Sequence, residues 1–80
     1  MLKLIYKMKT MINTEKLKKD LVSMRYSKDQ SMDTACKEIG ISKPTYSRME
    51  NGNTPDALTL LKVSKWLGVN PNIYLKTENL

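Results

Sequence analysis

The sequence predicts an all-α domain of five short helices, with a short β-strand or a basic arm in front of it. Apolar residues recur at the helical period over residues 14–75. Glycines and capping residues separate the successive apolar stretches, as they do between helices. The chain has 80 residues and is 40% apolar, which is enough for one modest core but leaves no room for a second folded unit.

Residues 1–13 are expected to form the strand or arm. Residues 2–9 show the period of a strand, with Leu2, Leu4, Tyr6 and Met8 alternating with Lys3, Ile5, Lys7 and Lys9. A single strand needs a partner for its backbone groups, and the same segment of a second chain is one candidate. A disordered basic arm is the alternative, and a third reading is that translation starts at Met8 or Met11.

The first helix is expected over residues 14–26. Asn13 or Thr14 is placed to cap it, and Glu15 lies in its first turn, where a negative charge is favourable. Its apolar stripe consists of Leu17, Leu21 and Met24.

Two helices with a tight turn between them are expected at residues 32–39 and 43–51. Ser31 and Ser42 are placed to cap them, and Gly40 can take the left-handed backbone that ends the first one. The inner faces are apolar and hold Met32, Ala35, Cys36, Ile39, Tyr46 and Met49. The outer face of the second helix is small, polar and basic, which suits a helix that lies in a groove of DNA. It holds Lys43, Pro44, Ser47, Arg48 and Asn51.

Two further helices are expected at residues 55–67 and 71–75, followed by a frayed tail at 76–80. Each begins with a capping residue and a proline, Thr54-Pro55 in one case and Asn70-Pro71 in the other. The longer helix has a broad apolar arc, which predicts that it is covered on several sides, with a subunit contact as one candidate cover. That arc holds Ala57, Leu60, Leu61, Val63, Ser64 and Leu67, and the expected anchors of the last helix are Ile73, Tyr74 and Leu75.

The charge is positive and unevenly distributed. Residues 1–30 carry eight Lys/Arg against three Asp/Glu, a net of +5, and residues 31–80 carry six against five, a net of +1. This balance fits a polyanionic partner, but a solvated basic surface would account for it equally well.

Several classes of protein are disfavoured. The chain has no histidine, no cluster with metal-ligand spacing and no nucleophile next to a base, so we expect no metal, no cofactor and no enzyme activity. The single cysteine, Cys36, falls on an apolar face and is read as a small buried hydrophobe. No apolar run approaches the roughly 20 residues that span a bilayer, and lysines interrupt the N-terminal segment, so we expect a cytoplasmic protein with no membrane association.

The order of these parts resembles a known family. The segments ACKEIGISKPTYSRMENG and TPDALTLLKVSKWLGVNP, with their flanks over residues 14–75, resemble the Cro and lambda-repressor-like helix-turn-helix domains, also called the xenobiotic-response-element family. The resemblance implies a five-helix lambda-repressor-like fold whose second central helix enters the major groove of double-stranded DNA.

The resemblance also implies roles for particular residues. Base contacts would come from Lys43, Pro44, Ser47 and Arg48, with Arg48 best suited to guanine because its planar fork matches O6 and N7. Contacts to the DNA backbone would come from Ser31, Thr45, Asn51, Gly52 and Asn53. Arg25 and Glu50 would tie the first helix to the recognition helix, as a partly exposed ion pair worth about 1 kcal/mol or less.

The sequence departs from the family pattern at a few positions. Met32 replaces a glutamine that often contacts phosphate, and Pro44 removes a hydrogen-bond donor from the reading surface. Gln30 stands where an apolar residue is usual, which predicts a looser loop between the first two helices. Cys36 and Ser64 replace small alanines.

The function implied is sequence-specific binding of double-stranded DNA by a small dimeric repressor that reads a palindromic operator. One such helix covers too few base pairs to single out a site, so a homodimer on two half-sites is expected. The candidate dimer surfaces are the region after Gly52, the neighbourhood of Trp66, residues 73–80 and the N-terminal arm. The alternative is a protein-interaction module, such as an antitoxin or adaptor, whose main partner is a protein.

Overall fold

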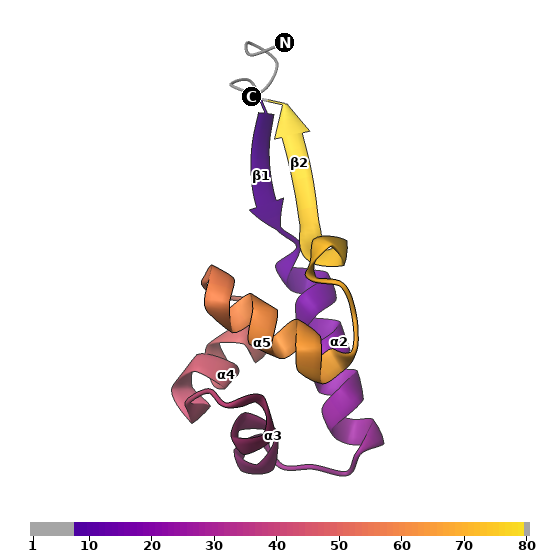
Figure 1. Cartoon of the computed structure of the whole chain (residues 1–80), viewed down its shortest axis with the longest axis vertical. Helices are drawn as coiled ribbons and strands as arrows, with labels where there is room; N and C mark the ends of the chain where they lie inside the picture. The colour runs from indigo at the N-terminus through magenta and orange to yellow at the C-terminus, as the bar shows by residue number, and fades with distance from the viewer. Residues whose placement is uncertain (1–7, 80) are drawn as a thin grey trace.

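The computed structural model describes residues 8–79, and side chains for residues 11–76. The mostly helical fold is confirmed, with four α-helices in this part of the chain. The fifth helix expected at residues 71–75 is not confirmed, because residues 71–74 form one 3-10 turn. The strand expected near the N-terminus is present over residues 8–12, and a second strand follows the 3-10 turn. In chain order the elements are β1 (Met8–Ile12), α2 (Thr14–Ser27), α3 (Met32–Ile39), α4 (Lys43–Glu50), α5 (Ala57–Leu67), η1 (Pro71–Tyr74) and β2 (Leu75–Asn79) (Figure 1).

β1 and β2 form a two-stranded antiparallel ribbon. The ladder pairs Ile12 with Leu75 beside the helices and Met8 with Asn79 at the far end. Figure 1 shows that the ribbon projects from the helical body at the end opposite α3. The expected tail at 76–80 is therefore wrong for residues 76–79, which are the partner that the first strand needs. The remainder of the alternating pattern, at residues 1–7, lies outside the described residues.

One hydrogen bond next to the ribbon brings the two ends of the chain together. The backbone N–H of Asn13 donates to the carbonyl of Tyr74 at 2.6 Å. This bond puts the segment before α2 in register with the segment after η1. The ladder then satisfies backbone groups that a frayed tail would leave to water.

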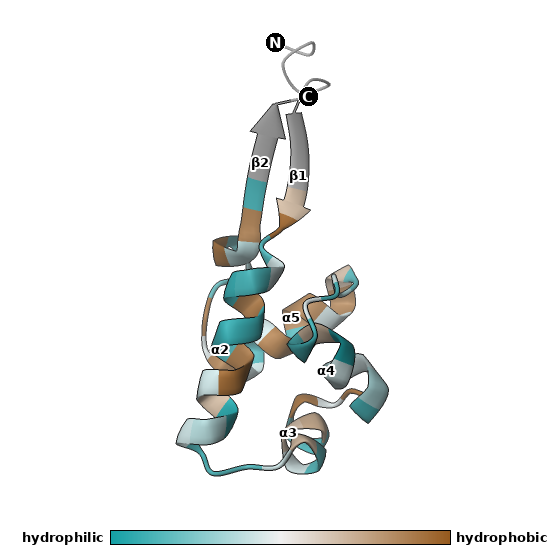
Figure 2. Cartoon of the chain, turned by 180° about the vertical axis from the view of Figure 1, so that it is seen from behind, coloured by the Kyte–Doolittle hydropathy of each residue, from teal (hydrophilic) through white to brown (hydrophobic). Residues whose placement is uncertain are grey.

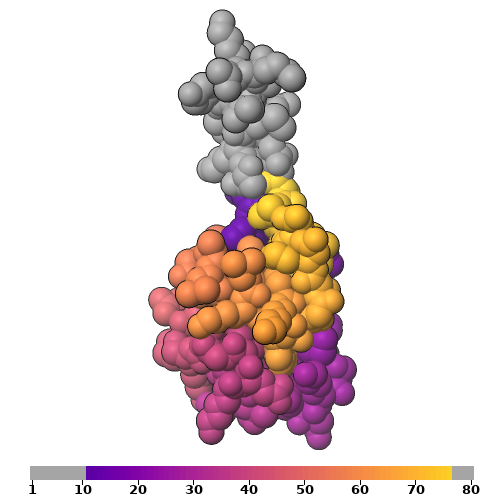
Figure 3. Space-filling view, viewed as in Figure 1, coloured from indigo at the N-terminus to yellow at the C-terminus, as the bar shows by residue number. Residues whose placement is uncertain are grey.

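The core lies between the helices and is built from one stripe on each. Figure 2 shows α5 largely in apolar colours and α4 in pale to hydrophilic ones. In Figure 3, α5 and the residues after it lie across the upper part of one face of the helical body. Met24 and Met32 are only partly buried against this core. The buried apolar residues are Leu17, Leu21, Ala35, Cys36, Ile39, Tyr46, Met49, Leu60, Val63, Leu67 and Tyr74.

α5 begins later than the sequence predicts and buries a narrower stripe. Its cap is Asp56, whose carboxylate accepts the N–H of Thr59 at 2.9 Å, whereas Thr54 was expected to cap it. Ala57 is exposed, and Leu61 is 55% exposed. No element in the described part of the chain covers these two positions, although α5 contacts α2, α3 and η1.

Candidate nucleic-acid interface

The turn between α3 and α4 fixes the relative orientation of these two helices. Gly40 ends α3 with φ +88°, the left-handed conformation that glycine adopts without strain. Ile41 then packs against the core, and the hydroxyl of Ser42 accepts the N–H of Thr45 at 3.3 Å to start α4. α4 therefore leaves the turn with Tyr46 and Met49 buried and its opposite side facing solvent.

The outer side of α4 carries the four residues expected to contact bases. Lys43, Pro44 and Arg48 are exposed, and Ser47 is half-buried. The Nε of Arg48 donates to the carbonyl of Pro44 at 3.3 Å, so the side chain lies back along its own helix. Its terminal nitrogens make no hydrogen bond among the described residues, and they remain available for the bidentate geometry that guanine accepts.

The loop after α4 uses its backbone donors internally. The N–H groups of Asn51 and Gly52 donate to carbonyls of α4, and the N–H and side-chain amide of Asn53 both donate to the carbonyl of Arg48 at 2.9 and 3.1 Å. These bonds satisfy the carbonyls that a helix end leaves free. The backbone N–H groups of this loop are therefore already engaged. Among the contacts to the DNA backbone expected from this loop, the exposed side chain of Asn51 is free of these bonds.

Ser31 and Thr45, the other two residues expected at the DNA backbone, lie in the first turns of α3 and α4. The hydroxyl of Ser31 accepts the N–H of Thr34 at 3.2 Å and caps α3. The hydroxyl of Thr45 lies 2.8 Å from that of Ser42. Both groups therefore belong to helix caps, and each cap sits where a helix N-terminus attracts anions.

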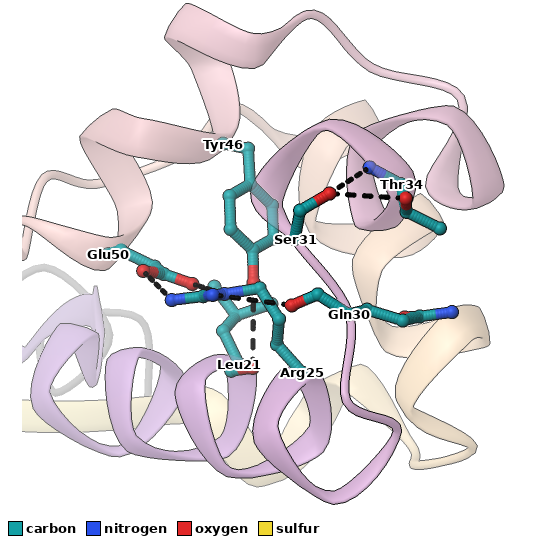
Figure 4. A network of polar contacts seen from close by, with 7 residues as sticks. All are labelled: Leu21, Arg25, Gln30, Ser31, Thr34, Tyr46 and Glu50. Atoms are coloured by element: carbon teal, nitrogen blue, oxygen red, sulfur yellow. Dashed lines mark hydrogen bonds and ion pairs between the residues drawn. The ribbon is translucent and has the colours of Figure 1, made fainter.

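Arg25 of α2 makes two hydrogen bonds to Glu50 at the end of α4. The Nε–Oε2 distance is 2.9 Å and the Nη2–Oε1 distance is 3.2 Å (Figure 4). The side chains are only 14% and 8% exposed, so the pair is less accessible to water than the sequence led us to expect. Hydrogen bonding to Glu50 raises the pKa of the Arg25 guanidinium despite its burial.

A buried tyrosine lies next to this pair. The hydroxyl of Tyr46 donates to the carbonyl of Leu21 at 3.5 Å, which links α4 to α2 a second time (Figure 4). Burial raises the pKa of that hydroxyl, and the carboxylate of Glu50 raises it further. α4 is thus fixed to α2 along two of its turns.

The loop from α2 to α3 is held by a polar network that the sequence did not predict. The amide of Gln30 donates to Glu38 at 2.8 Å, and the indole N–H of Trp66 donates to the other Glu38 oxygen at 2.9 Å. The ammonium of Lys28 lies 3.6 Å from Glu38 and 5.0 Å from the Trp66 ring centroid. The looser loop expected from Gln30 is therefore wrong, since Gln30 ties the loop to α3.

A second unpredicted contact joins the first turns of α3 and α4. The ammonium of Lys43 lies 3.3 Å from the carboxylate of Asp33. The two residues are ten positions apart, across the turn, so no helical spacing relates them. Only the orientation of the two helices brings them together.

This arrangement defines the class of protein. Two short helices across a glycine turn, with a polar outer face on the second and a buried ion pair behind it, form a helix-turn-helix unit. The helix-turn-helix family model matches residues 28–73, so the chain belongs to the Cro/C1-type, xenobiotic-response-element-like helix-turn-helix family, and the resemblance seen in the sequence is confirmed. This family binds DNA, so membership indicates that the chain is a DNA-binding regulator. Proteins of this family are typically not enzymes.

Two further comparisons gave no match. Neither the curated proteins nor the solved structures include one that matches this chain. Among residues 8–79, no helix is long and apolar enough to cross a membrane.

Proposed function

We propose that the chain is a sequence-specific regulator that binds double-stranded DNA with α4 in the major groove and acts as a homodimeric repressor. The observation that carries the proposal is the outer face of α4. Lys43, Ser47 and Arg48 lie together on it, and the Arg25–Glu50 pair holds the helix from behind. A polar, basic helix face that is held in place from behind is what a helix in the major groove presents to base edges.

Arg48 is the residue that we assign to direct base reading. Its guanidinium is long enough to reach a base edge and presents two parallel donors to guanine O6 and N7. Lys43, at the start of α4, would donate to a base or a phosphate. Pro44 has no donor and would contact a thymine methyl group or act sterically.

A second copy of the chain is the partner that we assign to α5. Leu58 and Leu61 lie one turn apart near its start and are 61% and 55% exposed. α5 begins directly after the loop that ends α4, so a two-fold axis beside these leucines would bring two α4 helices next to each other on one side of the dimer. Consecutive half-sites of DNA, about 34 Å apart, require such symmetry.

The experiment is selection of bound sequences from random duplex DNA at two salt concentrations. We expect a palindromic site for the wild type. Arg48→Lys keeps the charge and loses the fork, so it should bind with similar salt dependence and a relaxed preference at one base of each half-site. Lys65→Ala, which removes an exposed charge from the last turn of α5, is the control and should keep the wild-type preference.

The alternative, a protein-interaction module, predicts a different result. It draws support from the exposed leucines and from the small net charge of residues 31–80. In that case binding would be weak, equal for all sequences and abolished by salt, since only non-specific attraction would remain.

The dimer is tested by sedimentation equilibrium. Leu58→Ser/Leu61→Ser should give a monomer with an unchanged circular dichroism spectrum, because both side chains are more than half exposed. Ile73→Ser is the control, since Ile73 is 42% exposed but lies in η1, beside the ribbon. If Ile73→Ser disrupts the dimer and the leucine variant does not, the interface lies at the ribbon end and not on α5.

A further inference from the structure

Asp33 places a negative charge on the side of the molecule that we assign to DNA. It lies in the first turn of α3, two residues after the cap Ser31, and is 65% exposed. An acid in the first turn favours the helix, but the same carboxylate repels phosphate from the α3 N-terminus. No hydrogen bond among the described residues requires Asp33 there, because Ser31 supplies the cap.

Asp33 contacts Lys43, one of the residues assigned above to the DNA site. Its carboxylate lies 3.3 Å from the ammonium of Lys43, which is 58% exposed at the start of α4. The only other basic side chain on α4 is Arg48, and Arg25 behind the helix is neutralised by Glu50. In the free protein, therefore, one of the two cations on the recognition helix is matched by an acid.

We propose that Asp33 is a specificity-determining residue of the DNA site, which acts by withholding Lys43 from the phosphate backbone. This inference rests on the proposed function. Non-specific binding depends on how many phosphates the protein neutralises. An ammonium paired with Asp33 contributes little to that count, and a phosphate drawn toward Lys43 would approach the carboxylate as well.

Specific binding is affected less. An ammonium has three donors, so Lys43 can donate to a base edge and keep Asp33 as a second partner. A base acceptor carries only a partial negative charge, so the carboxylate repels it much less than it repels a phosphate. Asp33 therefore weakens binding to arbitrary DNA more than binding to the selected site, which widens the ratio between them.

The test compares Asp33→Asn with Glu15→Gln, which neutralises an acid in the first turn of α2, at the ribbon end of the molecule. Both variants gain one unit of charge, and neither loses its helix cap. Affinity is measured by fluorescence anisotropy for the selected site and for a scrambled duplex, over a range of salt concentrations. Asp33→Asn should bind scrambled DNA about fivefold more tightly, with a salt slope steeper by about 1, and should gain about twofold or less on the selected site. Glu15→Gln should match the wild type on both.

A cycle with Lys43→Met decides whether Asp33 acts through Lys43. In that background Asp33→Asn should change the affinity for scrambled DNA by less than about twofold. The same fivefold gain without the lysine, or equal gains on both duplexes, would overturn the proposal while leaving sequence-specific binding intact. No preference for any sequence in the wild type would overturn the proposed function and this inference together.

Discussion

The guanidinium of Arg25 and the carboxylate of Glu50 face each other in a two-bonded geometry with little access to water. They are 25 residues apart in the sequence and join the end of α2 to the end of α4. A buried pair of this kind is costly to break, because the remaining partner keeps its charge without compensation. It therefore fixes the angle at which α4 is presented.

Arg25→Met should lower the free energy of unfolding by about 2–4 kcal/mol, measured by urea denaturation. The matched control is Lys16→Met on the same helix, which breaks an exposed pair with Asp20 and should cost less than about 1 kcal/mol. Arg25→Met/Glu50→Leu should recover much of the loss, since no charge is then left unpaired. Equal losses for Arg25→Met and Lys16→Met would show that burial adds nothing to the pair.

Tyr74→Phe should lower the free energy of unfolding by about 1–3 kcal/mol, because it removes a partly buried hydrogen bond to a carboxylate. The Tyr74 hydroxyl donates to Asp20 at 2.7 Å and ties η1 to α2. Burial is the main cause that raises the pKa of this hydroxyl, and the hydrogen bond to Asp20 raises it further. Tyr26→Phe is the control and should be neutral, since Tyr26 is 69% exposed. Thermal unfolding monitored by circular dichroism gives the change in the free energy of unfolding for both variants.

Asp56→Asn should reduce the loss of stability in acid. Hydrogen bonding from Thr59 holds the pKa of Asp56 below its ordinary value. Asp56 therefore binds a proton less readily in the folded state than in the unfolded state. The stability that its ionised carboxylate contributes is complete above about pH 4 and is lost as pH falls through the pKa of Asp56 in the folded state. Asparagine can cap α5 but does not titrate in this range.

The measurement is the midpoint of thermal unfolding between pH 7 and pH 2.5. The wild type and Asp56→Asn should differ little at pH 7, and the variant should lose less stability on acidification. Parallel curves for the two proteins would contradict the assignment of this acid sensitivity to Asp56.

Cys36 should behave as a packed apolar side chain. It is 4% exposed, and burial raises the pKa of its thiol, so the reactive thiolate is scarce. Alkylation by iodoacetamide should proceed only as fast as the protein unfolds. Cys36→Ser should destabilise by about 1–3 kcal/mol, and Cys36→Ala by less, because serine buries a hydroxyl. Rapid alkylation of the native protein would contradict this.

Local sequence accounts well for the elements around the central turn. The caps Ser31, Gly40 and Ser42 depend only on backbone groups three or four residues away. In the structure each of them caps the helix end at which it was expected. The burial of Ala35, Ile39, Tyr46 and Met49 also follows from helical period alone.

The ribbon and the exposed side of α5 could not be predicted in this way. A strand needs a partner, and the partner of β1 lies more than 60 residues away in β2. The exposure of Leu58 and Leu61 depends on which elements cover α5, and periodicity gives the width of an apolar arc without showing how much of it is covered.

The sequence by itself determined the helices, their caps and the polar outer face of α4, because each of these depends on backbone preferences and on side chains a turn apart. Tertiary structure decided the contacts between charges: the burial of Arg25 against Glu50, and the meeting of Asp33 with Lys43. The strength of an ion pair depends on distance and on exclusion of water, and both are set by how the helices pack. The face of α4 is thus a property of the sequence, while its angle and its available charge are properties of the fold.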